Sequence, residues 1–319
     1  MTYDACAFPV HDSLSVSQFS GNHAGQGGGI SVSGVTTVSI QAGTSFSGNS
    51  ASVADDEASS LGGGILVSQT WASISDVSFS SNSAGRGGGI YIDCPSATAC
   101  TNPTVFSGCT FSDNVALLSG GGIMWDNVEP SLQCTGSGCP GPVQSSTLLS
   151  EDPSIKALQL SIAHSMTLRS VIGPVRLQNL APSTFSGNSA PYGGDVGSAS
   201  KRVTVLVAGN ITAETSGASF TQDLLVAVLD QYGAIVSTDN TTRVDASAPS
   251  TIDGSTVDIT GVRSLVVQNG VANFRGIGLV ADPGSSARLE VQSFYYYYYY
   301  YYFCFRCTKC PCVVRRMVD

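Results

Sequence analysis

Apolar residues in the first two hundred positions come in short runs that alternate with serine, threonine and other small residues. After each of four glycine clusters, two apolar residues stand two positions apart. These pairs are Ile30/Val32, Ile65/Val67, Ile90/Ile92 and Ile123/Trp125. A period of two places such side chains on one face of a β-strand, whereas a helix would repeat every three or four residues. The pattern therefore predicts many short strands with one buried face each.

A four-residue motif, Phe-Ser-x-Asn, recurs five times, and a glycine cluster follows each copy. Its aromatic and amide residues are Phe19 and Asn22, Phe46 and Asn49, Phe79 and Asn82, Phe111 and Asn114, and Phe185 and Asn188. The cluster reads GGGI at 27–30, 62–65, 87–90 and 120–123, and YGGD at 192–195. The first four copies are 27, 33 and 32 residues apart, which is the length of one supersecondary unit. The fifth copy lies 74 residues further on, which leaves room for an intervening degenerate coil.

Repeats of this kind stack as coils, with like residues above one another at the strand spacing of about 4.8 Å. We expect the five Phe residues to form an inward column and the five Asn residues to form an internal ladder at a turn. No Asn of the motif has Ser or Thr two positions later, so none is a glycosylation acceptor. We interpret the ladder as structural and the glycines as tight turns with close backbone approach. Cys109 precedes Phe111 at an inward position, which predicts a small buried hydrophobe.

The recurring pairing of FxxN with a glycine cluster and Ile resembles the repeats of the chlamydial polymorphic outer-membrane proteins. It is also similar to β-helical surface proteins of single-celled eukaryotes. The resemblance covers roughly residues 14–199. It implies a right-handed parallel β-helix, the pectin-lyase-like fold, on an extracellular face.

From about Lys201 the pattern changes to seven or so short strands separated by turn signals. Such spacing is typical of a β-sandwich of about 90 residues. The segments DQYGAIV, GVANF and PGSSARLEV resemble the Ig-like modules of bacterial adhesins. Asn210 (N-I-T) and Asn240 (N-T-T) are acceptable glycosylation sites within this segment.

The last segment is of low complexity. Eight consecutive tyrosines precede four cysteines, Cys304, Cys307, Cys310 and Cys312. The Cys-x-x-Cys spacing is compatible with zinc, but no second pair at finger spacing and no histidine accompany it. We expect a disordered tail without metal. The predicted organisation is therefore a β-helix over 1–199, an Ig-like β-sandwich over 200–292 and a tail over 293–319.

Charge and cysteine content narrow the class of protein. Charged residues make up 12 % of the chain and the formal net charge is −9. Without a basic stripe, nucleic acid is not an expected partner. Cys94 and Cys100, and Cys134 and Cys139, each bracket a short loop that a disulfide could close, which fits an oxidising compartment; free thiols are the alternative.

The opening residues MTYDACAFPVHDS contain neither a basic nor an apolar region of a signal peptide. No run of about 18 apolar residues predicts a membrane span. We expect an extracellular or cell-surface protein, and we expect that this chain is a fragment of it.

Catalytic chemistry would have to lie on the outward positions of the coils. Three residues after each GGGI isoleucine come Ser33, Ser68, Asp93 and Asp126. On adjacent coils, Asp93 and Asp126 would lie about 5 Å apart, close to the carboxylate separation of retaining glycosidases. Tyr91 and Met124 would face outward beside them. Two acids in one column can equally be solvated surface, and the acidic insert at 55–57 is expected to be a solvated loop.

The sequence favours a non-catalytic surface protein that serves adhesion, recognition or structural display. Glycans or other surface proteins are the expected partners, and no cofactor or metal is expected. The alternative is a polysaccharide-active β-helix enzyme, a lyase or glycoside hydrolase, that uses Asp93 and Asp126.

Overall fold

The computed structural model of the chain is all-β apart from one turn of 3₁₀-helix, η1 (Glu57–Ser59). The residues that it describes are 11–35, 37–94, 104–126, 130–132, 134–135, 181–199, 201–206, 212–213, 216–221, 223–248, 257–280, 286–293, 302–306 and 312–317. They form two compact units. The first contains the described residues up to 199 together with Gln231–Ala234, and the second contains the remainder.

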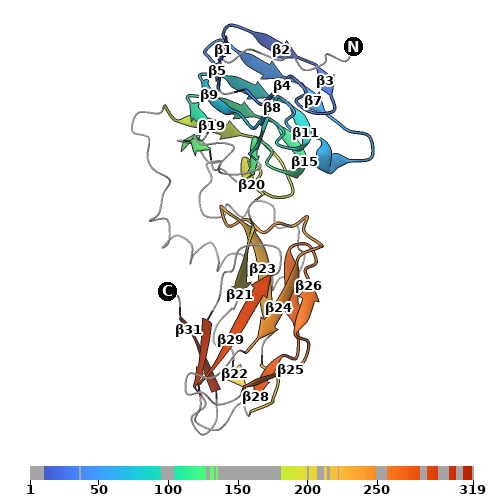
Figure 1. The fold of residues 1–319 in the computed structure, drawn as a ribbon, viewed down its shortest axis with the longest axis vertical. Coiled ribbons are helices and arrows are strands. Elements are labelled where there is room, and N and C mark those ends of the chain that lie inside the picture. Colours follow the sequence, from blue (N-terminus) through green and yellow to red (C-terminus); the bar gives the residue numbers. More distant parts are fainter. Residues whose placement is uncertain are drawn as a thin grey trace. The chain divides into compact units, whose positions relative to one another are not determined.

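Four parallel sheets make up the first unit (Figure 1). Sheet A contains β1 (His11–Leu14), β5 (Thr37–Ile40), β9 (Trp71–Ser75), β13 (Val105–Ser107) and β17 (Ser131–Leu132). Sheet B contains β2 (Gln18–Ser20), β6 (Ser45–Ser47), β10 (Ser78–Ser80), β14 (Thr110–Ser112), β19 (Ser183–Ser186) and β18 (Cys134–Thr135). Sheet C contains β3 (His23–Ala24), β7 (Ser50–Ala51), β11 (Ser83–Arg86) and β15 (Val115–Ser119). Sheet D contains β4 (Ile30–Ser33), β8 (Ile65–Ser68), β12 (Ile90–Asp93), β16 (Ile123–Asp126) and β20 (Val196–Ser198).

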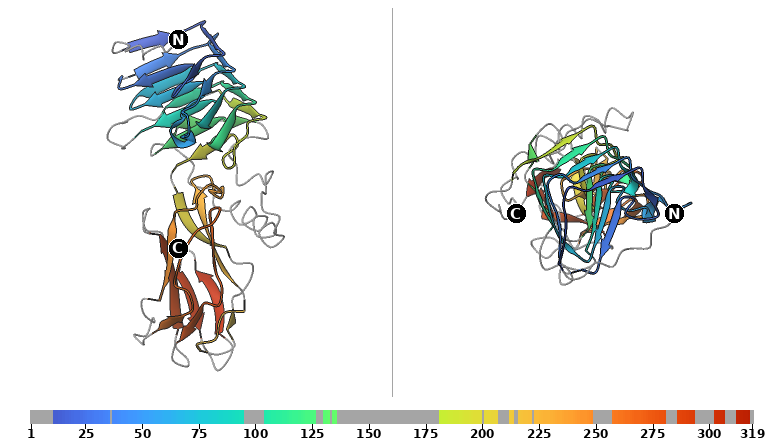
Figure 2. Two further views of the ribbon diagram at one scale, coloured as in Figure 1. Left: turned by 90° about the vertical axis from the view of Figure 1, so that its right-hand side faces the viewer. Right: turned by 90° about the horizontal axis from the view of Figure 1, so that it is seen from above.

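The chain visits sheets A, B, C and D in turn and then starts the next layer, so that each strand pairs with the strand one layer on. This is the connectivity of a parallel β-helix, and it confirms the prediction of stacked parallel strands. We call one passage through the four sheets a coil and the whole arrangement the coil stack. Figure 2 shows the coils one above another from the side and end-on.

The interior of the coil stack is filled by one column of aromatic rings and several columns of aliphatic side chains. Successive Phe rings of the repeat lie parallel, with centroids 4.8–5.1 Å apart from Phe19 through Phe185. Phe46, Phe79 and Phe111 are fully buried. Stacked aromatic pairs contribute about 0.5–1.5 kcal/mol each beyond their buried area. Cys109 lies buried in the same core, and burial raises the pKa of its thiol to about 11.

The Asn residues of the repeat form a hydrogen-bonded ladder along the inside of the turn between sheets B and C. The side-chain amide of each Asn donates to Oδ1 of the Asn one coil on, at 2.9–3.0 Å. The backbone N–H of each Asn donates to that same Oδ1. From the second coil onward, the second amide hydrogen goes to the Phe carbonyl of the preceding coil. The buried amides are therefore satisfied, as a low-dielectric interior requires.

The glycine triplets turn the chain from sheet C into sheet D. The first glycine of each has a positive φ, +66° at Gly62 for example, which glycine adopts without steric cost. At the second and third glycines the neighbouring coil comes too close for a side chain. A Cβ added to Gly88 would lie 2.5 Å from the carbonyl oxygen of Gly121 in the next coil.

The fifth coil stacks directly on the fourth. Phe111 pairs in register with Phe185, and their ring centroids are 4.8 Å apart. The degenerate coil for which we left room between them does not exist. The extra residues are an insertion between β17 in sheet A and β19 in sheet B. Its described strand, β18, pairs with Ser183 and Thr184 on the outer edge of β19.

The short segment Gln231–Ala234 belongs to the first unit. Tyr232 packs against the core of the coil stack. Its hydroxyl accepts a hydrogen bond of 2.9 Å from the indole N–H of Trp125, and the two rings meet edge to face. A buried indole normally requires such a partner, because its N–H cannot otherwise be satisfied.

The second unit is antiparallel throughout its described strands. Its first sheet contains β21 (Lys201–Leu206), β23 (Leu224–Asp230) and β27 (Val271–Phe274). A second contains β22 (Thr212–Ala213), β31 (Cys312–Met317), β30 (Tyr302–Arg306), β29 (Ser286–Ser293), β24 (Arg243–Ser247) and β26 (Ser264–Val266), and a third contains β25 (Asp258–Thr260) and β28 (Gly278–Val280). Alternating buried residues such as Leu224, Val226 and Phe274 form its core. Ig-like topology stays a prediction.

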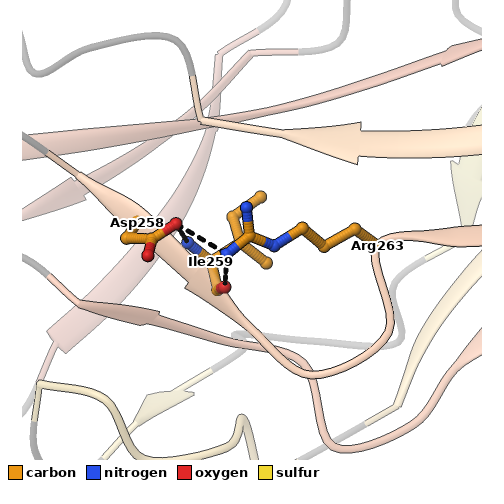
Figure 3. A network of polar contacts seen from close by, with 3 residues as sticks. All are labelled: Asp258, Ile259 and Arg263. Carbon is orange, nitrogen blue, oxygen red and sulfur yellow. Dashed lines mark hydrogen bonds and ion pairs between the residues drawn. The ribbon is translucent and has the colours of Figure 1, made fainter.

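Turns of the second unit are held by local polar contacts. The Asp239 carboxylate accepts hydrogen bonds from the backbone N–H and hydroxyl groups of Thr241 and Thr242. Between β25 and β26, the Arg263 guanidinium binds Asp258 and the Ile259 carbonyl (Figure 3). Both charged side chains of this pair are more than half exposed, so the ion pair contributes under about 1 kcal/mol.

The tail predicted to be disordered instead contains strands β30 and β31, which pair with each other and with β29 and β22. Tyr, Phe, Cys and Val favour extended backbone, and β29 offers a free edge for a hairpin. Low complexity therefore did not prevent strand formation at these positions.

Candidate functional site

The two aspartates singled out from the sequence lie at the same position of adjacent strands. Asp93 ends β12, Asp126 ends β16, and the two are partners in the parallel register. Both are half-buried. One coil earlier the same column contains Ser68, whose hydroxyl donates 3.1 Å to Oδ2 of Asp93. Adjacent strands are about 4.8 Å apart, so the two carboxylates belong to neighbouring rungs.

Tyr91 and Met124, expected to face outward, point away from the interior core but are not exposed. They precede the aspartates by two residues and are 4 % and 0 % exposed. Burial raises the pKa of the Tyr91 phenol to about 12, and the charges of Asp126 and Asp93 act in the same direction. The positive charge and a hydrogen bond of Arg86 act against them. Tyr91 is therefore a neutral hydrogen-bonding group at physiological pH and not a base.

Arg86 is the residue at this site that the sequence analysis missed. It ends β11, directly before the glycine triplet of the third coil, and the tight turn brings its guanidinium to the Tyr91 hydroxyl. The residues that occupy the same position in the neighbouring coils are Gln26, Leu61 and Ser119. A single charged residue in an otherwise neutral column is the signal that could have revealed it.

We define the outward site by Arg86, Tyr91, Asp93 and Asp126. It offers two carboxylates as acceptors, a guanidinium as a donor and a phenol that stays protonated. These groups suit hydrogen bonding to hydroxyl-rich ligands, because carboxylates and guanidinium groups make the stronger, charge-assisted bonds. Within the part of the chain that the structure describes, no group of three or more His, Cys, Asp or Glu residues could hold a metal ion.

The acidic insert at 55–57 forms an exposed turn and not a ligand cluster. Asp56 caps η1 by accepting hydrogen bonds from the hydroxyl and backbone N–H of Ser59. The Ser59 hydroxyl bond is the largest cause that lowers the pKa of Asp56, and the charge of Arg86 contributes slightly. Carboxylates at a helix N-terminus are stabilised in this way without any ligand.

The predicted modification sites are described in part. Cys94 is disulfide-bonded, and Cys100 and Cys139 lie outside the described residues. Cys134 begins β18. Asn210 lies outside the described residues, whereas Asn240 is exposed and its Oδ1 accepts the backbone N–H of Asn269 at 2.8 Å. The pairings Cys94–Cys100 and Cys134–Cys139, and glycosylation at either Asn, stay predictions.

Comparison with known proteins finds one known repeat in two segments of the coil stack. Residues 17–33 and 76–93 match the Chlamydia polymorphic membrane protein repeat. Each matched segment runs from the region of the FxxN motif through the glycine triplet to the end of the sheet D strand. Neither a curated protein nor a solved structure matches the chain. In the described residues, no helix is long and apolar enough to cross a membrane.

Proposed function

We propose that this chain, which contains repeats of the Chlamydia polymorphic membrane protein type, is a non-catalytic protein of a cell surface or extracellular space. The coil stack would act as a rigid support for adhesion, recognition or display, with the Ig-like second unit as a further module. The observation that carries the proposal is the repeat itself, because its family consists of surface and outer-membrane proteins.

Within each coil, the positions that packing restricts to particular residues are separate from the positions that it leaves variable, and this supports the proposed role. Phe, Asn and the glycines of the repeat face the interior or the neighbouring coil, where stacking and hydrogen bonding require them. The outward positions that end the sheet D strands meet no such requirement, and they vary from Ser33 to Ser68 to Asp93. A stack of this kind holds a variable surface on a constant frame, which suits recognition of glycans or of other surface proteins.

Surface location is tested on intact cells that produce the protein. An antibody against the first unit is expected to label them without permeabilisation, and added protease is expected to remove that labelling. Labelling that appears only after permeabilisation would contradict the proposal. Disulfide closure at Cys94–Cys100 and Cys134–Cys139 and glycans on Asn210 and Asn240 would accompany export. Peptide mass mapping with and without reduction and deglycosylation tests both.

A polysaccharide-active enzyme is the second candidate, and the register of Asp93 with Asp126 is the observation in its favour. Two carboxylates on adjacent rungs are close to the separation that retaining glycosidases use. The test is a polysaccharide panel scored for both retention and released product, with Asp93→Ala/Asp126→Ala beside the unaltered protein. Ser33→Ala, in the same column but exposed and two coils away from Asp93, is the matched control. Product that disappears only in the double variant would establish the enzyme and refute the non-catalytic proposal.

A further inference from the structure

Sheet A presents an aromatic residue among hydroxyl groups on its outward face. Its outward positions alternate with buried residues such as Ala72 and Ile74 of β9. Where the structure describes their side chains, all of these positions hold Ser or Thr except Trp71 and Val105. The hydroxyl residues are Ser13, Thr37, Ser39, Ser73, Ser75 and Ser107. None of these described side chains is charged, although the chain as a whole has a formal net charge of −9.

Trp71 begins β9 and is placed differently from the other tryptophan of the chain. Trp125 points into the core, is 1 % exposed and donates its indole N–H to Tyr232. Trp71 points outward and is half-buried, and its indole nitrogen is buried without a hydrogen-bond partner among the described residues. The Trp71 side chain therefore offers a ligand its carbon surface and not its N–H.

Hydroxyl groups adjoin Trp71 at the regular spacing of the sheet. Thr37 is its partner on the preceding coil, and Ser73 is the next outward residue of its own strand. Such neighbours lie about 4.8 Å apart between strands and about 7 Å apart along a strand. In the part of the chain that the structure describes, the Ser73 and Ser75 hydroxyls have no hydrogen-bond partner. Both can therefore donate to a ligand and accept from it.

Sugar rings match this combination of aromatic carbon and uncharged hydroxyl groups. A pyranose with equatorial substituents, as in β-linked glucose or N-acetylglucosamine, has C–H bonds on its faces and hydroxyl groups at its edge. The faces can pack on an indole while the edge exchanges hydrogen bonds with Ser and Thr. A stable protein interface would instead bury about 800 Å² on each partner around an apolar core. An anionic glycan would find no cation on this described face and would approach an acidic chain.

We propose that the outward face of sheet A around Trp71 binds a neutral glycan, with a pyranose ring stacked on the indole. The inference rests on the proposed function, because it assumes the recognition role of a surface protein. It assigns the glycan to a face other than that of Asp93 and Asp126, which end strands of sheet D. Binding there requires no bond to be made or broken.

Tryptophan fluorescence of the full chain tests this site directly. Cellohexaose and N-acetylchitohexaose are titrated as neutral probes, and hexagalacturonate is the anionic control. Both neutral probes are expected to change the emission in a saturable way, because a sugar would contact the ring of Trp71. In Trp71→Phe the remaining tryptophan is the buried Trp125, and the emission is expected not to respond.

Titration calorimetry with the same probes measures the affinity of the variants. Trp71→Ala is expected to weaken binding roughly tenfold or more, and Trp71→Phe is expected to weaken it less, because a smaller aromatic face remains. Ser73→Ala should weaken binding roughly threefold or more through the loss of one hydroxyl group. Ser80→Ala, at a half-buried outward serine of sheet B, is the matched control and should leave the affinity unchanged.

A thermal midpoint for each variant shows that it is folded, and the fluorescence of the unaltered chain does not depend on any variant. No saturable response to either neutral probe would overturn the proposal. Tighter binding of hexagalacturonate, or an affinity that a folded Trp71→Ala leaves unchanged, would also overturn it. Labelling of intact cells is measured independently, so a failure of the glycan site is distinguishable from a failure of the proposed surface location.

Discussion

The centre of the Asn ladder is the place where a single substitution tests the architecture most sharply. Asn82 is fully buried and takes part in four side-chain hydrogen bonds of 2.9–3.0 Å. Asn82→Ala leaves two buried donors without partners, the Asn49 N–H and one Asn49 amide hydrogen, and removes one of the hydrogen bonds to the Phe46 carbonyl. Each orphaned donor costs about 1–3 kcal/mol, so we expect the first unit to lose about 2–6 kcal/mol.

The matched control is Asn22→Ala at the exposed end of the same ladder. It removes one side-chain bond to Asn49 Oδ1, which keeps the Asn22 backbone N–H as a donor, so a loss of about 1 kcal/mol or less is expected. Both tryptophans of the chain, Trp71 and Trp125, lie in the first unit. Their fluorescence in a denaturant titration therefore reports on the coil stack separately from the second unit. Equal losses at the two positions would refute the ladder as a source of stability.

Three further predictions concern the packing and the outward site. Gly88→Ala should destabilise the first unit strongly, because its Cβ would lie 2.5 Å from the Gly121 oxygen, whereas Gly194→Ala should be nearly neutral; thermal midpoints compare them. Phe111→Ala, which leaves a cavity between two stacked rings, should cost about 3–5 kcal/mol in denaturant titration. The pKa of Tyr91 is raised from 10.0 to about 12 in the folded state, so its contribution to stability is complete below pH 10.0 and is lost as pH rises toward about 12; Tyr91→Phe should flatten the stability profile in that window.

The parts of the fold that repeat were the parts that could be predicted. Phe and Asn recur at the positions of Phe79 and Asn82, and this recurrence predicted stacked rings and an Asn ladder. Stacked repeats bury equivalent residues in every coil, so equivalent residues come to lie next to one another. Parity along sheet D strands identified Ile90 and Ile92 as inward. It could not show that Tyr91 on the other face is also buried, since parity assigns a face and not what covers that face.

Features that arise from contacts between columns were not predictable from spacing. Arg86 reaches Tyr91 across the glycine turn, although the two belong to different columns of the repeat. Sequence distance also does not distinguish a degenerate coil from an insertion, because both lengthen the gap between copies. The register of Phe111 with Phe185, and the pairing of β18 beyond β19, show that the gap contains an insertion.

In a stacked repeat, the residues with special contacts are those that differ from the residues at the equivalent positions of the other coils. The column before the triplet reads Gln26, Leu61, Arg86 and Ser119, and its one charged member is the residue that contacts the outward Tyr91. The column at the third glycine is constant until Asp195, which belongs to the last coil of the described residues. Stacking requires similar residues at equivalent inward positions of successive coils. A residue that differs from its equivalents must therefore fit the geometry at its own position. Arg86 in the outward site and Asp195 are therefore two places where a substitution should act through local contacts and not through the periodic packing of the core.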